Sequence, residues 1–232
     1  MSSEKSALPR HVGYIIDGNR RWAKKHGLPT YEGHLAGYNA VKEVAFATLE
    51  AGVEYMSIYV FSSENWTRSQ EEIKHLMALV LRLFTTDSHM FDENGIRLKV
   101  LGMREGLNKN IVKEIERLES RTKDNTKGTL AICLNYGGQG EIVDAVKKIV
   151  RSGIAAEKID ETLIAENLYG AEVPPVDVVV RTSGEKRLSN FMLWRAAYSE
   201  FIFLDKMWPD MTKEDVVGIM EEYSRRHRRF GG

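Results

Sequence analysis

Short apolar segments alternate with amphipathic ones along nearly the whole chain. Runs rich in β-branched and aromatic residues predict buried strands, because such side chains suit a covered, pleated surface. Apolar positions three and four residues apart predict helices between these runs. The predicted strands are Val12–Ile16, Tyr55–Phe61, Ile96–Leu101, Thr129–Leu134, Val176–Val180 and Phe201–Leu204, and the predicted helices cover about 35–51, 69–92, 107–122, 140–152 and 212–228.

This alternation also predicts the fold class. Apolar strands that alternate with helices favour a mainly parallel sheet flanked by helices. The chain has no internal repeat, no low-complexity tract and only five prolines, so no linker divides it. We therefore predict a single α/β domain over residues 1–232, with a mainly parallel six-stranded sheet.

The predicted helix at 69–92 is more apolar than a surface helix. Nine of the twelve residues from Ile73 to Phe84 are apolar, whereas an ordinary surface helix buries a single stripe. A central core helix or a subunit interface would explain this composition. A helix shared between the core and an apolar ligand cavity would explain it equally well.

The composition excludes several classes of protein. Hydrophobic residues make up 43% of the chain and charged residues 28%, as in folded globular proteins and unlike disordered ones. Lys and Arg number 33 and so do Asp and Glu, which disfavours a general nucleic-acid binder. The longest apolar run, Leu76–Leu81, has six residues, and a membrane span needs about 20. Without a secretory signal we expect a cytoplasmic protein, or an organellar one if a transit peptide was removed.

Several kinds of site are excluded by spacing. The single cysteine, Cys133, can form neither an intrachain disulfide nor a thiolate cluster, and its apolar neighbours indicate a buried, inert thiol. The chain also lacks a nucleotide-binding P-loop, a dinucleotide-binding fingerprint, a His-Glu-x-x-His zinc pattern and a Gly-x-Ser-x-Gly nucleophile elbow. Nucleotide, zinc and serine-hydrolase chemistry therefore find no support.

Polar residues directly follow four of the predicted strands. The segments are 17–22, 62–68, 135–140 and 181–190, and ligands of parallel sheets bind beyond the carboxyl ends of the strands. Arginines beside glycine-containing loops suit a phosphate or diphosphate, because a guanidinium offers two parallel donors. A lone carboxylate such as Asp17 can hold Mg²⁺ if phosphate oxygens complete its shell. The residues Asp17-Gly18-Asn19 would equally suit a simple turn.

Eight sequence motifs, four of them in these segments, follow one another along the chain in a recognisable order. They are Asp17-Gly18-Asn19-Arg20-Arg21-Trp22-Ala23, Gly33-His34-x-x-Gly37, Phe61-Ser62-Ser63-Glu64-Asn65-Trp66-x-Arg68, Asn135-Tyr136-Gly137-Gly138, Arg181-Thr182-Ser183-Gly184-Glu185-x-Arg187-Leu188-Ser189-Asn190-Phe191, Trp194-x-x-x-Tyr198-x-Glu200, Trp208-Pro209-Asp210 and Arg228-Arg229-Phe230-Gly231-Gly232. From His11 to Gly232 the chain resembles the cis-prenyltransferases, the family of undecaprenyl diphosphate synthase.

The resemblance implies a reaction and its partners. In this family isopentenyl diphosphate is condensed onto an allylic diphosphate, such as farnesyl or geranyl diphosphate, to give a cis-polyprenyl diphosphate. The resemblance further implies Mg²⁺ as cofactor, a homodimer and an apolar tunnel for the growing chain, while the balanced charge predicts no nucleic-acid partner. We expect the product lipid to pass to a membrane.

The resemblance also assigns roles to individual residues. Asp17 and Asn65 would be catalytic, and Asp17 and Glu200 would hold the metal. Because an amide is a poor base, we expect Asn65 to position reacting groups. The implied substrate-binding residues are Gly18, Asn19, Arg20, Arg21, Trp22, His34, Ser62, Ser63, Glu64, Trp66, Arg68, Arg181, Arg187, Leu188, Ser189, Arg229 and Gly231.

Within that set, Gly18 to Arg21 and His34 would bind the allylic diphosphate. Arg181, Arg187 and Ser189 would bind the isopentenyl diphosphate. The C-terminal Arg229-Phe230-Gly231 resembles an element that reaches the partner subunit's site, and a frayed basic tail is the alternative.

Three positions depart from the family pattern. Arg20 stands where many bacterial members have glycine, Thr30 where many have arginine, and Lys186 where histidine is frequent. Thr30 is therefore a weak ligand candidate. Product length and the preferred starter stay open, so the alternatives are a short-chain cis-prenyl diphosphate synthase or a non-catalytic partner subunit of a heteromeric prenyltransferase.

Overall fold

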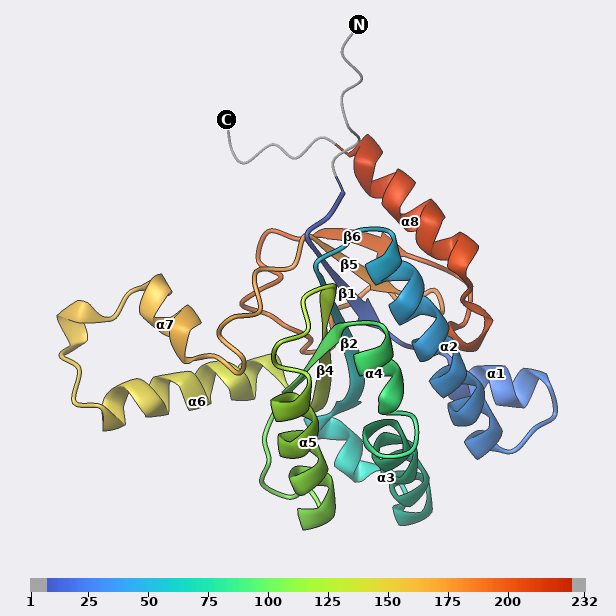
Figure 1. Ribbon diagram of the computed structural model, residues 1–232, viewed down its shortest axis with the longest axis horizontal. Coiled ribbons are helices and arrows are strands. Elements are labelled where there is room, and N and C mark those ends of the chain that lie inside the picture. The colour runs from blue at the N-terminus through green and yellow to red at the C-terminus, as the bar shows by residue number, and fades with distance from the viewer. Residues whose placement is uncertain (1–7, 227–232) are drawn as a thin grey trace, which may run out of the picture.

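A six-stranded parallel sheet forms the centre of the computed structural model, which describes residues 8–226 (Figure 1). The strand order is β3-β4-β2-β1-β5-β6, and every neighbouring pair is parallel. The strands are β1 (His11–Ile15), β2 (Tyr55–Ser62), β3 (Ile96–Leu101), β4 (Gly128–Tyr136), β5 (Val178–Arg181) and β6 (Glu200–Phe203). The predicted single-domain α/β fold with its six-stranded sheet is confirmed.

Helices follow most of the strands. In the described part of the chain they are α1 (Asn19–Lys25), α2 (Thr30–Glu50), α3 (Gln70–Phe84), α4 (His89–Glu93), α5 (Lys109–Arg121), α6 (Gly138–Arg151), α7 (Glu161–Asn167) and α8 (Lys213–Arg225), with short 3₁₀ helices η1 (Ser63–Thr67), η2 (Ala156–Lys158) and η3 (Trp208–Asp210). None of the helices within residues 8–226 is long and apolar enough to cross a bilayer. The short helices α1 and α7 depend on packing, because seven residues form few internal hydrogen bonds.

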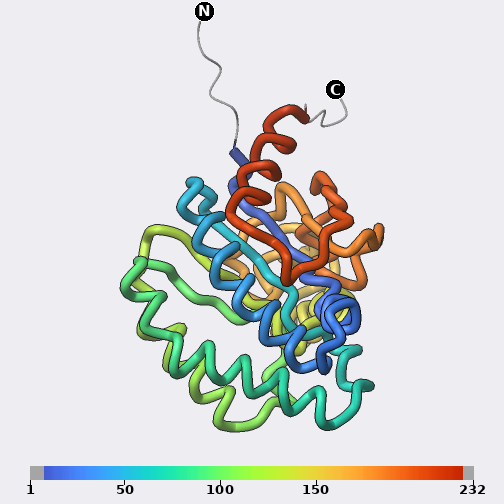
Figure 2. The backbone as a smooth tube through the Cα atoms, turned by 90° about the vertical axis from the view of Figure 1, so that its right-hand side faces the viewer, coloured from blue at the N-terminus to red at the C-terminus, as the bar shows by residue number. Residues whose placement is uncertain are grey.

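The two faces of the sheet are covered differently. On one face, side chains of α2, α3, α4, α5 and α8 form the main core with β-strand residues such as Tyr14 and Ile58. Figure 2 shows α2 between α8 and α3 on this face. On the other face, the segments 169–176 and 188–196 pack against Tyr59, Val179 and the fully buried Cys133. Helices α6 and α7 extend to one side of the sheet (Figure 1) and pack mainly against each other.

The predicted helix at 69–92 is wrong in its length, because the structure divides it into α3 and α4. The break comes at the sequence Thr85-Thr86-Asp87-Ser88, whose short polar side chains compete for backbone hydrogen bonds. The Asp87 carboxylate accepts hydrogen bonds from Tyr38 Oη at 2.7 Å and Lys42 Nζ at 3.0 Å, both on α2. A tertiary contact with α2 thus stabilises the turn between the two helices.

The pairing of β2 with β4 is irregular at the carboxyl ends of the strands. The register shifts twice there and leaves Val60 as an extra residue on β2 and Asn135 as an extra residue on β4. Asn135 adopts a left-handed backbone conformation with φ 49°, which asparagine tolerates better than most residues. Bulges of this kind redirect side chains and are frequent beside active sites.

Candidate active site

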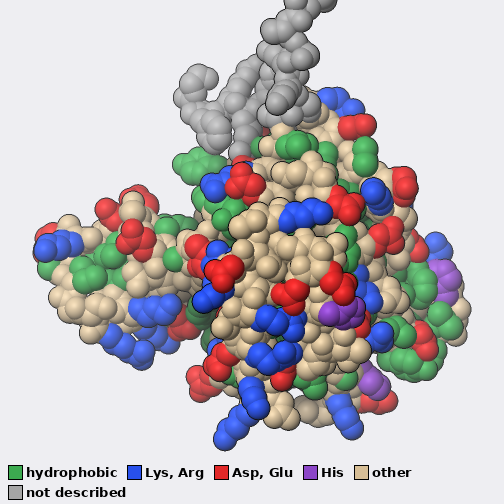
Figure 3. All heavy atoms as spheres, viewed as in Figure 1, with side chains coloured by type: hydrophobic (Ala, Val, Ile, Leu, Met, Phe, Trp, Pro, Cys, Tyr) green, Lys and Arg blue, Asp and Glu red, His purple; other side chains and the backbone are tan. Residues whose placement is uncertain are grey.

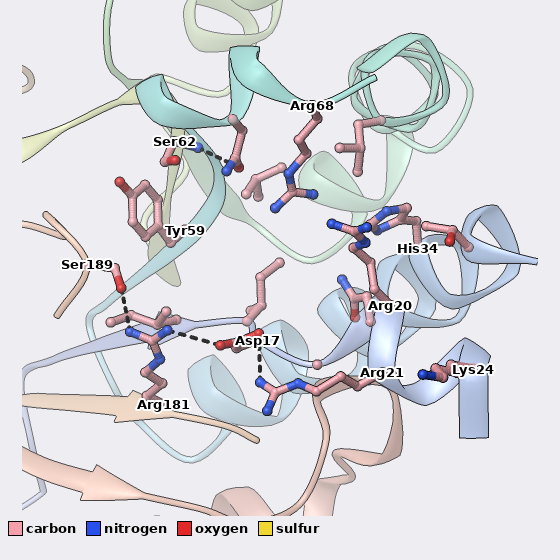
Figure 4. A pocket seen from close by; sticks show the side chains of 18 of the residues that line it. Asp17, Arg20, Arg21, Lys24, His34, Tyr59, Ser62, Arg68, Arg181 and Ser189 are labelled. Carbon is pink, nitrogen blue, oxygen red and sulfur yellow. Dashed lines mark hydrogen bonds and ion pairs between the residues drawn. The ribbon is translucent and has the colours of Figure 1, made fainter. Parts of the chain in front are cut away.

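An open cavity of about 790 Å³ lies beyond the carboxyl ends of β1, β2 and β5 (Figure 4). This is the edge of the sheet at which the polar motifs were predicted to meet. The cavity is lined by most of the predicted site residues, namely Asp17, Gly18, Asn19, Arg20, Arg21, His34, Ser62, Asn65, Arg68, Arg181 and Ser189. The fold therefore brings the first, second and fourth motifs into a single space.

Asp17 follows β1 and is held by its backbone. Its N–H donates to the Thr182 hydroxyl at 3.0 Å, and this hydroxyl donates to the Asp17 carbonyl at 2.7 Å. The Trp208 N–H donates to the same carbonyl at 3.0 Å. These bonds leave the carboxylate to point into the cavity, where it pairs with Arg181 at 3.0 Å and Arg21 at 3.2 Å (Figure 4).

Arg181 is the most enclosed cation of the cavity, with only 5% of its side chain exposed. Its Nη2 faces Asp17, and its Nη1 donates to Ser189 Oγ at 2.7 Å and to the Arg187 carbonyl at 2.5 Å. A guanidinium fixes several partners at once because its donors lie in one rigid plane. Arg181 thus joins the end of β5, the loop after it and the carboxylate of Asp17.

Helix α1 is placed against α2 by glycines on both sides of the contact. Gly18 begins the helix with φ 111°, a conformation that residues with a side chain rarely adopt. A Cβ atom on Gly33 would lie 2.1 Å from the Asn19 carbonyl oxygen, and one on Gly37 would lie 2.4 Å from Asn19 Oδ1. The absence of side chains at Gly33 and Gly37 therefore sets the position of α1 and of Arg20 and Arg21 upon it.

A carboxylate that the sequence analysis did not single out holds the other cations. Glu72 Oε1, on α3, lies 3.0 Å from His34 Nε2, 3.0 Å from Arg68 Nη1 and 3.9 Å from Arg20 Nε. The Ser69–Glu72 spacing is that of a capping box, and Ser69 does accept from the Glu72 N–H. The Glu72 side chain, however, points to the cations of the cavity. The sequence did not predict these contacts, because they depend on how α3 packs against its neighbours.

The protonation of this cluster follows from its burial and charges. Burial lowers the pKa of His34 by more than the neighbouring Glu72 raises it. Burial alone would raise the pKa of Glu72, but the hydrogen bond from His34 and the charges of Arg68 and Arg20 bring it below its ordinary value. Near neutral pH the site thus pairs a neutral imidazole with a carboxylate, and His34 Nε2 carries the shared hydrogen because a carboxylate only accepts.

The cavity also has lining residues outside the predicted set of catalytic, metal-binding and substrate-binding residues. Lys24 is a cation on α1, and the apolar contributors are Ile15, Ile16, Leu28, Tyr59, Val60 and Leu76. Thr30, ranked as a weak ligand candidate, lies on the wall as well. Tyr59 stands near the end of a predicted strand, just before the second motif, and this position is the signal that would have found it.

Leu76 places one face of α3 against the cavity. It faces the cavity, whereas Val80 and Phe84 on the same helix are buried in the core. Of the interpretations left open for this apolar segment, the arrangement favours a helix shared between the core and a cavity.

Several predicted binding residues lie outside the lining of the cavity. Trp22 Nε1 donates to Asp210 at 2.6 Å, Trp66 Nε1 donates to Asn135 at 2.8 Å, and Glu64 accepts from Asn190 at 2.8 Å. The remaining ones are Ser63, Leu188 and the exposed Arg187, whose guanidinium bonds to Glu185. The predicted Arg229 and Gly231 lie outside the described residues.

Glu200 is not brought to Asp17 within one chain, as the predicted shared metal site would require. Glu200 opens β6 and is paired in register with Val178, the first residue of β5, whereas Asp17 lies beyond the carboxyl ends of the strands. The Glu200 carboxylate instead bonds to Arg226 at 3.1 Å. The reason is geometric, since in a parallel sheet the two ends of a strand lie at opposite edges.

Asp17 on its own fits a magnesium site in which the substrate supplies most ligands. Its carboxylate is partly exposed in the cavity and is surrounded by cations that also suit a diphosphate. No group of three His, Cys, Asp or Glu side chains within residues 8–226 could enclose a metal by itself. Mg²⁺ is often held in this way, through one carboxylate and substrate phosphates.

The charge of the cavity differs from that of the whole chain. Basic and acidic side chains are mixed over the surface seen in Figure 3, in keeping with equal totals of 33 and 33. The cavity lining, by contrast, holds Arg20, Arg21, Lys24, Arg68 and Arg181 against the single carboxylate of Asp17. A parallel α/β fold with such a basic cavity beside an apolar wall is typical of a protein that binds an anionic ligand with an apolar part.

Comparison with known proteins identifies the family to which the chain belongs. The family model described as "Putative undecaprenyl diphosphate synthase" matches residues 15–231. An isoprenyl transferase of Thermotoga maritima is 43% identical over 97% of each chain. A trans,polycis-polyprenyl diphosphate synthase of Thermobifida fusca, described as (2Z,6E)-farnesyl diphosphate specific, is 42% identical over 98% of this chain and 82% of its own.

Solved structures agree with the sequence relatives. Lavandulyl diphosphate synthase from Lavandula x intermedia, in complex with dimethylallyl diphosphate, has a TM-score of 0.93 at 30% identity, over 97% of this chain and 99% of that one. A probable undecaprenyl diphosphate synthase from Campylobacter jejuni has a TM-score of 0.82 at 27% identity with the same coverage. The chain therefore belongs to the cis-prenyltransferase family of undecaprenyl diphosphate synthase, and it is an enzyme that transfers prenyl groups.

Proposed function

We propose that this prenyltransferase condenses isopentenyl diphosphate onto an allylic diphosphate, with Mg²⁺, to give a cis-polyprenyl diphosphate. The observation that carries the proposal is the cavity itself, in which five cations and one carboxylate lie beside an apolar wall. Two diphosphates need several cations, and a prenyl chain needs apolar contacts. The complex of a related enzyme with dimethylallyl diphosphate supports the assignment of an allylic substrate.

The family resemblance and the positions of the side chains support separate roles for Arg20, Arg21 and the neutral His34 and for Arg181 and Ser189. Arg20, Arg21 and His34 flank the start of α1 and α2 and bind the allylic diphosphate, while Arg181 and Ser189 bind the isopentenyl diphosphate. The allylic diphosphate leaves as an anion, so fixed guanidinium groups stabilise the charge that develops on it. Their position is set before the substrate arrives, because Asp17 holds two of the arginines.

Asp17 and Asn65 have distinct roles in this scheme. Asp17 holds Mg²⁺, which when bound neutralises the negative charge of the departing diphosphate. Asn65 Oδ1 already accepts from the Ser62 N–H at 3.2 Å, which fixes its amide at the cavity wall. There it orients the isopentenyl group, whose lost proton passes to water or to a diphosphate oxygen, since an amide is too weak a base.

The enzyme acts as a homodimer in the cytoplasm, and its lipid product passes to a membrane. Helix α6 supports the dimer, because Val143, Val146 and Val150 are exposed by 51%, 42% and 65%. An apolar groove of about 750 Å³ lies beside it, lined among others by Leu168 and Trp194. Exposed apolar surface of this extent is typical of subunit interfaces, and light scattering after size exclusion measures the mass directly.

The proposed reaction is tested with purified protein, Mg²⁺ and radiolabelled isopentenyl diphosphate. Dimethylallyl, geranyl and farnesyl diphosphate serve as separate starters, and chromatography of the product gives its length. Incorporation of label that disappears when EDTA is added is the expected result. If no starter yields a labelled prenyl product, the proposal is refuted.

Asp17→Asn tests the assigned metal ligand. The amide keeps an oxygen for Arg181 but removes the negative charge, so we expect the turnover number to fall at least about 100-fold. Asp92→Asn is the matched control, because Asp92 is paired with Arg121 on the helical layer and does not line the cavity. Circular dichroism checks that both variants fold, and wild-type turnover in Asp17→Asn would contradict the role.

A further inference from the structure

The third motif, Asn135-Tyr136-Gly137-Gly138, has no place in the cavity lining. Its first residue is nonetheless unusual, because Asn135 is the extra residue at the second register shift, is almost fully buried, and has φ 49°. A buried polar side chain in a left-handed bulge needs a reason in the bonds that it makes.

The amide of Asn135 joins two segments that are far apart in sequence. Its Nδ2 donates to the carbonyls of Met103 at 3.1 Å and Glu105 at 2.9 Å, in the loop after β3. Its Oδ1 accepts from the indole N–H of Trp66 at 2.8 Å. The loop bonds use both hydrogens of the amide, so the oxygen is turned towards Trp66 and is fixed there.

A second asparagine also bonds to a side chain of the same 3₁₀ helix, η1, in this case as the donor. Asn190, with φ 65°, donates from Nδ2 to Glu64 Oε1 at 2.8 Å. Its Oδ1 accepts from the Gln139 N–H at 2.8 Å, and its carbonyl accepts from the Gly138 N–H at 2.7 Å. Two asparagines on different segments thus each hold one side chain of η1.

The helix η1 and the residue that ends it include two residues of the proposed active site. Asn65 lies between Glu64 and Trp66, and Arg68 ends the turn, and both of these line the cavity. The ring of Trp66 also packs edge-on against Phe61 at 5.0 Å between centroids. A five-residue 3₁₀ helix has few internal bonds of its own, so outside contacts determine where its residues lie.

We propose that Asn135 and Asn190 are positioning residues, which fix η1 through Trp66 and Glu64 and thereby set Asn65 and Arg68 for the condensation. This inference rests on the proposed function. It replaces the predicted substrate-binding roles of Glu64 and Trp66 with an indirect one, because the Trp66 indole bonds to Asn135 and the Glu64 carboxylate bonds to Asn190. It also gives the third motif a role in the reaction.

The experiment is a double-mutant cycle on the Asn135–Trp66 bond. Trp66→Phe keeps an aromatic ring and removes the donor, and Asn135→Ala removes the acceptor. We expect each variant to lower the turnover number at least about tenfold while KM for isopentenyl diphosphate stays within about threefold, because Arg181 and Ser189 do not depend on η1. The loss in the double variant should be smaller than the two single losses combined, because both substitutions remove the Asn135–Trp66 bond.

A spectroscopic signal tests the same bond without turnover. The chain has four tryptophans, and Trp66→Phe identifies the Trp66 signal among the indole N–H resonances of ¹⁵N-labelled protein. In Asn135→Ala that signal should move upfield, because the indole N–H has lost its acceptor. Asn125→Ala is the matched control, since Asn125 Nδ2 also donates to two carbonyls, Phe91 and Ile96, but at the opposite edge of the sheet. It should reduce stability and leave the turnover number and the Trp66 signal unchanged.

A second cycle, Asn190→Ala with Glu64→Leu, does not disturb a buried group and serves if Asn135→Ala does not fold. Additive losses in the measurable cycle, an unmoved Trp66 signal, or a raised KM with an unchanged turnover number would each overturn the positioning role. If the wild-type enzyme forms no prenyl product, it is the proposed function that fails. An active wild type with additive variants leaves the function intact and refutes only the positioning.

Discussion

The Gly33→Ala variant tests whether the position of α1 controls enzyme activity independently of the stability of the fold. A Cβ atom at this site would lie 2.1 Å from the Asn19 carbonyl oxygen and 2.9 Å from Ala23 Cβ. Ordinary contacts begin near 3.4 Å, so α1 must move by about 1.3 Å relative to α2, because the obstacle is backbone that cannot rotate away. Asn19, Arg20 and Arg21 move with it.

The size of the functional loss follows from that displacement. A misplacement of about 1 Å at a site of this kind costs about 100-fold in rate, so kcat/KM for the allylic diphosphate should fall about 100-fold. Stability responds through two opposing terms, a gain of about 1 kcal/mol from replacing glycine in a helix and an overpacking cost of about 1–3 kcal/mol. The folded fraction at assay temperature therefore changes far less than the activity.

Steady-state kinetics with varied allylic diphosphate measure the loss, and calorimetry with inorganic pyrophosphate reports binding without turnover. Gly218→Ala is the control, because Gly218 lies in α8 and a Cβ there would meet nothing within 4 Å. It should raise the free energy of unfolding by about 1 kcal/mol and leave kinetics unchanged. A Gly33→Ala enzyme with kcat/KM and pyrophosphate affinity within threefold of wild type would refute the role of this contact in placing α1.

Three further predictions test other parts of the structure. Arg181→Lys should lower kcat/KM at least about 100-fold in steady-state assays, because a compact ammonium lacks the planar fork that bonds Asp17 through one nitrogen and Ser189 and the Arg187 carbonyl through the other. A loss below threefold would contradict this. Arg195→Met leaves the buried Glu141 without its ion pair at 2.7 Å and should cost about 3–5 kcal/mol in urea unfolding, a cost that Glu141→Gln in the same chain should partly remove. Burial lowers the pKa of His11 to about 4 from 6.5, so the unfolded chain binds this proton first and stability should fall by about 3 kcal/mol between pH 6.5 and pH 4. Urea titrations at several pH values in that range should show that the free energy of unfolding depends more steeply on pH in the wild type than in His11→Gln. An equal dependence on pH in both proteins would rule out His11 as the cause.

Much of the site could be predicted because of a rule of topology. Asp17, Asn65 and Arg181 follow three strands that were recognisable from their apolar residues. Once those strands are parallel, their carboxyl ends meet, and the residues after them share one cavity. Local sequence patterns were therefore enough to place these side chains together without any knowledge of distances.

The parts that could not be predicted depend on contacts between distant segments. Glu72 has the spacing of a helix cap, yet its carboxylate bonds to His34 and Arg68. Trp66 stands inside a binding motif, yet its indole bonds to Asn135, 69 residues further along the chain. No local pattern distinguishes these partners, because each depends on how two elements pack.

The sequence by itself thus determined the six strands in chain order, the parallel sheet, and the position of most predicted site residues at one edge of that sheet. Hydrophobic periodicity and strand direction carry this information, since both are local properties of the chain. Only the tertiary structure decided the break after Phe84, the separation of Glu200 from Asp17, and the bonds that fix η1. Side-chain hydrogen bonds and ion pairs depend on distances of a few tenths of an ångström, and only the packing of helices against the sheet sets those distances.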